Sequence, residues 1–177
     1  IKIDNEEEKA ILNNLLKEGV FHLQNKDLKL AIKKFEKILL SRPDNSQVLN
    51  LNCIAYHQLG DLSKALNCIN KAIKHNPNEI GFHINLGNIM KDLKNYSDSK
   101  KAYENALKIN NRSVEAIYNI GVIYTAQHKY IEAITYYKKV IKSDSTHKYA
   151  FDNLGNAYME LAEFVKAINC FKKAISI

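Results

Sequence analysis

A pattern of small and large side chains recurs with a constant period along this chain and limits the folds open to it. Small side chains form one column at this interval, and most of them are glycine: Gly19, Cys53, Gly87, Gly121 and Gly155. A chain with such a period is expected to use one structural unit several times, instead of folding around a single central core.

Two further columns keep the same interval. A second small column follows the first at a fixed distance, at Ala31, Ala65, Ser99, Ala133 and Ala167. A large apolar column comes next, at Phe35, Ile69, Tyr103, Tyr137 and Phe171. Small residues let two helices approach closely, and a large side chain of the neighbouring helix fills the space that they leave. The columns therefore predict closely packed helices with a large side chain against each small residue.

Each unit is predicted to contain two helices joined by a short turn. Apolar residues recur at three- and four-residue steps on both sides of a break. The breaks carry residues that end and start helices, at 25–27, at Gly60 and Asp61, and at Lys94 and Asn95. The acidic stretch 4–8 is expected to start the first helix early, with Asp4 as its N-cap.

These columns resemble the tetratricopeptide repeat, a helix–turn–helix unit of about 34 residues. The resemblance implies an all-α, right-handed α-solenoid, with the first helix of each pair lining a concave groove. It covers five units, with the whole chain 1–177 forming one domain of a longer protein. The predicted repeats are 12–45, 46–79, 80–113, 114–147 and 148–177.

Composition and motifs argue against several classes of function. The chain is 46% hydrophobic and 25% charged, as in ordinary globular proteins, and has no apolar run long enough to span a membrane. Its 3 cysteines are far apart, which favours packing residues in a reducing compartment over disulfides or a zinc site. No catalytic or phosphate-binding motif occurs, so we expect a non-enzymatic intracellular protein without a cofactor or small-molecule substrate.

The net charge of +7 could indicate that the chain binds nucleic acid. Most lysines fall in the predicted second helices, where they are expected to form a solvated outer face. Only Arg42 and Arg112 are arginines, and most aromatic residues fall in packing columns. Nucleic-acid binding is therefore disfavoured.

An asparagine stands two positions before the small column in repeats 3 to 5, at Asn85, Asn119 and Asn153. Helical geometry predicts that these side chains are exposed on the groove side, where carboxamides can bind the main chain of an extended peptide. The row resembles the asparagine ladder in the repeat domain of O-linked N-acetylglucosamine transferases. Asparagine at this position is also ordinary framework of the repeat family. The predicted partner-binding residues are Asn85, Asn88, Lys91, Glu115, Tyr118, Asn119, Tyr149, Asn153 and Asn156.

The sequence thus predicts a module that binds a peptide or partner protein in its groove. Tyr118 and Tyr149 are the expected anchors, although either residue can instead pack against the neighbouring repeat. The basic residues with which related domains grip the acidic C-terminus of a chaperone are missing, so such a ligand is not expected. Two alternatives remain: a scaffold segment of an assembly, including self-association through the last repeat, and a substrate-docking domain of a larger enzyme such as a glycosyltransferase.

Overall fold

The computed structural model describes residues 5–177, and these residues form ten α-helices and no strand. The helices alternate with short turns along the chain. Their bounds are α1 (Asn5–Gln24), α2 (Leu28–Ser41), α3 (Ser46–Leu59), α4 (Leu62–His75), α5 (Ile80–Asp92), α6 (Tyr96–Ile109), α7 (Val114–Ala126), α8 (Tyr130–Ser143), α9 (Lys148–Glu160) and α10 (Phe164–Ser176).

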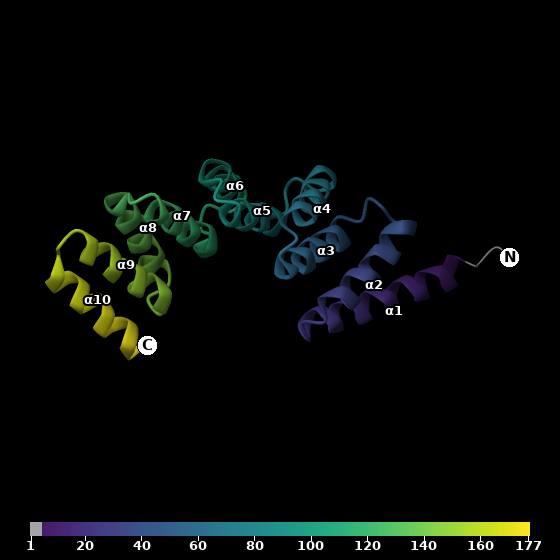
Figure 1. Ribbon diagram of the computed structural model, residues 1–177, viewed down its shortest axis with the longest axis horizontal. Coiled ribbons are helices and arrows are strands. Elements are labelled where there is room, and N and C mark those ends of the chain that lie inside the picture. The colour runs from purple at the N-terminus through teal and green to yellow at the C-terminus, as the bar shows by residue number, and fades with distance from the viewer. Residues whose placement is uncertain (1–4) are drawn as a thin grey trace. The chain divides into compact units, whose positions relative to one another are not determined.

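The chain divides into two compact units, of which one ends at Ile89 and the other begins at Met90. In the first unit α1 packs on α2, α2 on α3, and α3 on α4. In the second unit the contacts run in the same way from α6 to α10. Figure 1 shows the partners of a pair running in opposite directions, as α1 and α2 do. The predicted all-α fold class built of helix–turn–helix repeats is confirmed, whereas the single-domain assignment stays a prediction.

The turn inside each helix pair has the same backbone conformation, and it recurs at the interval of the small column. The residues with positive φ are Lys26 (61°), Gly60 (85°), Lys94 (58°), His128 (57°) and Ala162 (57°). This left-handed conformation is strained for any residue with a Cβ atom, and only Gly60 avoids the strain. The tight reversal is therefore imposed by the packing of the two helices, since lysine, histidine and alanine all adopt it.

Side-chain caps fix where several helices begin. The carboxylate of Asp61 accepts a hydrogen bond from the backbone N–H of Lys64, and the Asn95 Oδ1 atom accepts one from the N–H of Asp98. Asp27 stands at the equivalent position before α2 without a side-chain cap bond. The first helix begins early, as predicted, with a run of glutamates in its first turn. The expected cap Asp4 lies outside the described residues.

The predicted contact between the small column and the large column is present in three repeats. A Cβ atom added to Gly19 would lie 2.6 Å from a ring atom of Phe35, and one added to Gly155 would lie 2.5 Å from Phe171. In repeat 2 a cysteine replaces the glycine, and the matching member of the large column is Ile69, which is smaller than a ring. Cys53 and Ile69 are both fully buried in one core cluster. The larger residue in the small column, Cys53, is therefore matched by a smaller residue in the large column, Ile69, as close packing requires.

The described residues contain no helix that is both long and apolar enough to cross a membrane. The three cysteines are free thiols, with Cys53 and Cys68 buried and Cys170 half-buried. Burial raises the pKa of the Cys53 thiol to about 12, so it is a packing group and not a nucleophile.

Candidate functional site

The residues predicted to bind a partner lie on first helices of the repeats, in both units. Asn85 and Asn88 belong to α5 in the first unit. In the second unit, Lys91 lies in the last turn of α5, and the others lie in α7 and α9. The residues from α7 are Glu115, Tyr118 and Asn119, and those from α9 are Tyr149, Asn153 and Asn156.

A hydrogen bond joins α7 and α9 in the middle of this set. The Asn153 Nδ2 atom donates to the Tyr118 hydroxyl oxygen over 2.9 Å. Burial raises the pKa of Tyr118 above its ordinary value, so its phenol is neutral and keeps a hydrogen to donate. Among the described residues that hydrogen has no acceptor, and the Asn153 Oδ1 atom receives no hydrogen bond. The pair therefore holds two adjacent helices together and still offers one donor and one acceptor.

The two predicted aromatic anchors have different environments. The Tyr118 ring is half-buried and packs on the rings of His147 and Tyr137, with centroid distances of 4.9 and 5.9 Å. The Tyr149 side chain, in the first turn of α9, is 69% exposed. Each tyrosine was expected either to anchor a partner or to pack against the neighbouring repeat. Tyr118 packs, whereas Tyr149 has an exposed ring that is free to contact a partner.

Asn119 departs from the expectation that all three asparagines are exposed. Only 8% of this residue is accessible. Its Nδ2 atom donates to the backbone oxygen of Glu115 over 3.1 Å, and its Oδ1 atom accepts from Lys91 Nζ over 3.5 Å. The prediction of an exposed side chain is wrong for Asn119, because the side chain turns back along its own helix and under Lys91. Glu115, by contrast, is exposed in the first turn of α7.

The first unit contains a similar link between first helices. Asn85 Nδ2 donates to Asn50 Oδ1 over 2.7 Å, which joins α5 to α3. Asn85 and Asn88 are both half-buried, whereas Asn156 of the second unit is exposed. The asparagine before the small column thus bridges neighbouring first helices in each unit.

Sequence reasoning did not foresee these bridges or the part played by His147. The bridged pairs, Asn50 with Asn85 and Tyr118 with Asn153, are both separated by 35 residues. A search for polar pairs at one repeat plus one position would have found them. His147 supports the Tyr118 ring and also caps α9, because its Nδ1 atom accepts from the Ala150 N–H over 3.1 Å.

Groups that could bind a metal ion are not assembled in the part of the chain that the structure describes. No three histidine, cysteine, aspartate or glutamate side chains come together there. The candidate site consists instead of amides, phenols and single charges, which suit hydrogen bonding and aromatic contact with another polypeptide.

Comparison with family models gives a consistent result along nearly the whole chain. Models described as tetratricopeptide repeat match residues 22–89, 80–113, 114–147 and 149–177. No curated protein matches the chain.

Solved structures of similar fold were also found. MamA from Desulfovibrio magneticus RS-1 superposes with a TM-score of 0.84 at 17% identity, covering 94% of each chain. YrrB, described as a TPR protein with an unusual peptide-binding site, has a TM-score of 0.73 at 20% identity, over 95% of this chain and 90% of its own. PilF from Pseudomonas aeruginosa has a TM-score of 0.85 at 14% identity, over 95% of this chain and 77% of its own. These similarities are evidence for the fold.

Proposed function

Because the chain belongs to the tetratricopeptide repeat family and is a protein–protein interaction module, we propose that it binds a peptide segment of its partner on the exposed face of α7 and α9. The observation that carries this proposal is Tyr149, whose ring is 69% exposed in the first turn of α9. An exposed tyrosine beside a supported polar pair is typical of an interface anchor, since it buries much apolar area at a small cost in side-chain entropy.

The neighbouring groups match the main chain of a peptide. The Tyr118 hydroxyl has a hydrogen to donate, and the Asn153 Oδ1 atom can accept one. Both side chains are held in place by the hydrogen bond from Asn153 Nδ2 to the Tyr118 hydroxyl oxygen, so little conformational entropy is lost when a partner binds. Among the similar structures, YrrB is described as having a peptide-binding site, which supports a peptide as the ligand class.

The proposed contacts in the second unit are seven of the nine residues that the sequence singled out. Tyr149, Glu115 and Asn156 are exposed and would touch the partner directly. Asn119 and Lys91 would position the helix surface from below. Tyr118 and Asn153 complete the contacts in this unit, and Asn85 and Asn88 of the first unit are proposed as separate partner contacts.

The experiment is a peptide-display selection on the purified chain, followed by measurement of Kd for the selected peptides. Tyr149→Ala should weaken binding by about tenfold or more, as expected for an aromatic anchor. Ile131→Ala is the matched control, because Ile131 is 70% exposed but lies on the second helix α8.

Equal losses in the two variants, or no loss in Tyr149→Ala, would contradict the proposal. Thermal unfolding of each variant separates a binding effect from a folding effect. Both sites are exposed, so both unfolding midpoints should stay close to that of the unmodified chain.

A second candidate function rests on the surface of α10. Phe164, Val165, Ile168 and Ile175 are large apolar residues that are each at least half exposed. Such a patch marks a contact surface and supports a scaffold role, with self-association through this repeat. Analytical ultracentrifugation at increasing protein concentration tests it, and Ile168→Glu should abolish any dimer.

We also propose that the chain is not itself an enzyme and works inside the cell without a cofactor. Tetratricopeptide repeat proteins are typically non-enzymatic interaction modules. The free thiols support a reducing compartment. Nucleic acid is not a partner in this proposal. Docking of substrates for a larger enzyme is compatible with the same surface.

A further inference from the structure

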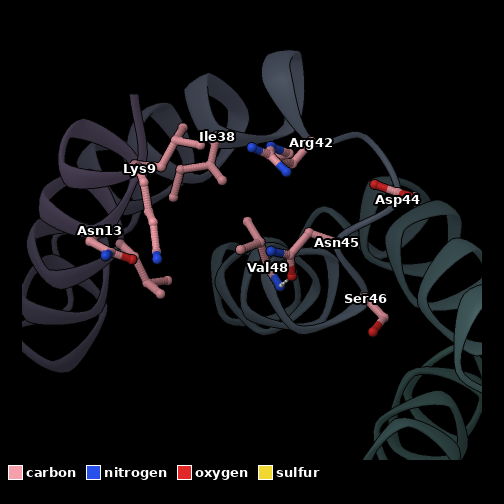
Figure 2. Close-up of a pocket in the computed structure, with 10 residues that line it drawn as sticks. Lys9, Asn13, Ile38, Arg42, Asp44, Asn45, Ser46 and Val48 are labelled. Carbon is pink, nitrogen blue, oxygen red and sulfur yellow. Dashed lines mark hydrogen bonds between the residues drawn. The ribbon is translucent and has the colours of Figure 1, made fainter. Parts of the chain in front are cut away.

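A cavity of about 510 Å³ lies in the unit that ends at Ile89, where α1, the end of α2 and the start of α3 meet (Figure 2). Its volume is sufficient for one or two side chains of a bound polypeptide. It lies outside the surface discussed above. The residues that line it are Lys9, Leu12, Asn13, Leu16, Ile38, Arg42, Asp44, Asn45, Ser46 and Val48.

Two cations from different segments of the chain line this corner. Lys9 comes from α1, and Arg42 is the residue directly after α2. Both side chains extend toward the space between α1 and α3 in Figure 2. Asp44 is the one carboxylate among the lining residues. No ion pair among the described residues involves Lys9, Arg42 or Asp44, so the corner presents unpaired positive charge.

The fold does not require an arginine at this position. The residues at the equivalent place after the other second helices are Asn76, Asn110 and Asp144. Each donates the same backbone hydrogen bond to its helix that Arg42 donates to the Ile38 oxygen over 2.9 Å. These helices therefore end with the same backbone hydrogen bond whatever the side chain. The guanidinium group of Arg42 is not needed to end α2 and can interact with a ligand.

The remaining lining groups define what would fit. Asn45 uses its Oδ1 atom to accept from the Val48 N–H over 3.1 Å, so its amide hydrogens are left to donate. The first turn of α3 adds the positive end of a helix dipole. Leu12, Leu16 and Ile38 supply an apolar wall beside these donors. The corner thus suits a carboxylate that lies next to an aliphatic side chain.

We propose that this corner binds a carboxylate side chain of an acidic peptide segment. Arg42 makes the planar, two-bonded contact with the carboxylate that guanidinium groups favour, and Lys9 adds a second charged donor. The neighbouring aliphatic side chain of the ligand packs on Leu12 and Ile38. This site is independent of Tyr149 and would persist if the surface of α7 and α9 bound nothing.

The test is a titration followed by backbone amide NMR, with the end-blocked peptide GDLDLG and its isosteric control GNLNLG. The acidic peptide should shift the amide resonances of Asn13 and Ser46, and the amide peptide should not. Arg42→Gln should weaken binding of GDLDLG by about tenfold, which is the usual size of a charge-assisted hydrogen bond. Lys9→Gln should weaken it by a smaller factor.

The matched control is Arg112→Gln, which changes the net charge equally at an exposed position outside the corner. An equal loss of affinity for GDLDLG in Arg112→Gln would show that the effect comes from the net charge of the chain, and this would overturn the proposal. Equal affinity for the two peptides would overturn it as well. Arg42-dependent binding of an oligothymidylate in place of GDLDLG would assign the corner to phosphate and also contradict the proposal.

Discussion

Gly121 of α7 lies so close to Tyr137 of α8 that an added Cβ atom would be 2.7 Å from the ring Cε1 atom. The Tyr137 ring is completely buried, and its hydroxyl group is hydrogen-bonded to Thr125 Oγ1 over 2.9 Å. The ring is therefore held by its buried surroundings and by this hydrogen bond. This contact fixes the distance between the two helices of the repeat.

Gly121→Ala should destabilise the second unit by about 1–2 kcal/mol, because the cost of overpacking exceeds the gain from replacing a glycine inside a helix. Gly81→Ala in α5 is the control, because its nearest neighbour would be 3.9 Å away. Urea unfolding should show a loss for Gly121→Ala and a small gain for Gly81→Ala. A gain in both would mean that the ring is mobile.

Ala162→Gly should stabilise the chain by about 0.5–1 kcal/mol, because glycine recovers most of the strain of a left-handed residue. Ala162 has a φ of 57°, in the region that a Cβ atom disfavours. Ala10→Gly, inside α1, should lower stability, because there the residue is helical and exposed. Thermal unfolding of both variants measures this difference in stability. A loss of stability in Ala162→Gly would show that the backbone of Ala162 is not strained.

Asn52→Leu should raise stability by about 1–2 kcal/mol, which is the usual cost of a buried polar atom without a partner. Asn52 is 2% exposed, its Oδ1 atom has no partner among the described residues, and its Nδ2 atom reaches only Cys68 Sγ at 3.9 Å. The equivalent positions in repeats 3 to 5 all hold leucine or isoleucine. Asn70→Leu on the exposed face of α4 controls for helix propensity. A loss of stability in Asn52→Leu would show that the core has no room for the larger side chain.

Stability should fall at high pH because of buried tyrosines. Burial raises the pKa of Tyr137 to about 12, whereas the pKa of tyrosine in the unfolded chain is about 10. The folded state holds the proton longer, so this contribution is complete below about pH 10 and is lost as pH rises from there through about 12. The slope of unfolding free energy against pH should be smaller in Tyr137→Phe. Identical slopes in the unmodified chain and in Tyr137→Phe would refute this assignment.

Asn119→Ala and Asn153→Ala should have different effects. Asn119 is buried with both ends of its carboxamide engaged, so its loss should cost about 1 kcal/mol of stability. Asn153 is half-buried, and Tyr118 can bond to water in its absence, so stability should change little while peptide affinity falls. Urea unfolding and peptide titration of each variant measure the two quantities. Equal losses of stability in the two variants would contradict the different roles assigned to Asn119 and Asn153.

Much of the fold was predictable from local regularities. The pairing of Gly19 with Phe35, and of Gly155 with Phe171, follows from two columns with a constant spacing. The turns at Gly60 and Lys94 were visible as turn and cap residues. Sequence did not predict that the equivalent turn residue Ala162 would adopt positive φ, because alanine favours a helix and only the packing of α9 on α10 forces the reversal.

The candidate site was predicted only as a set of residues on first helices. Asn119 and Asn153 occupy the same repeat position, yet one folds back on its own helix and the other bridges to Tyr118. Lys91 beside the first and Tyr118 beside the second decide the difference, and both are contacts between neighbouring helices. The cavity at Arg42 likewise depends on where three segments meet.

The repeat, the helices, the first three turns and the glycine–ring contacts can be predicted from the amino-acid sequence alone, because each follows from spacing along one chain at a fixed period. Tertiary structure decided which polar side chains are buried, which are bridged and which are free. The physical reason is that a helical pattern defines a face only to within a broad arc, whereas a hydrogen bond between helices requires a particular rotation and rotamer of both partners.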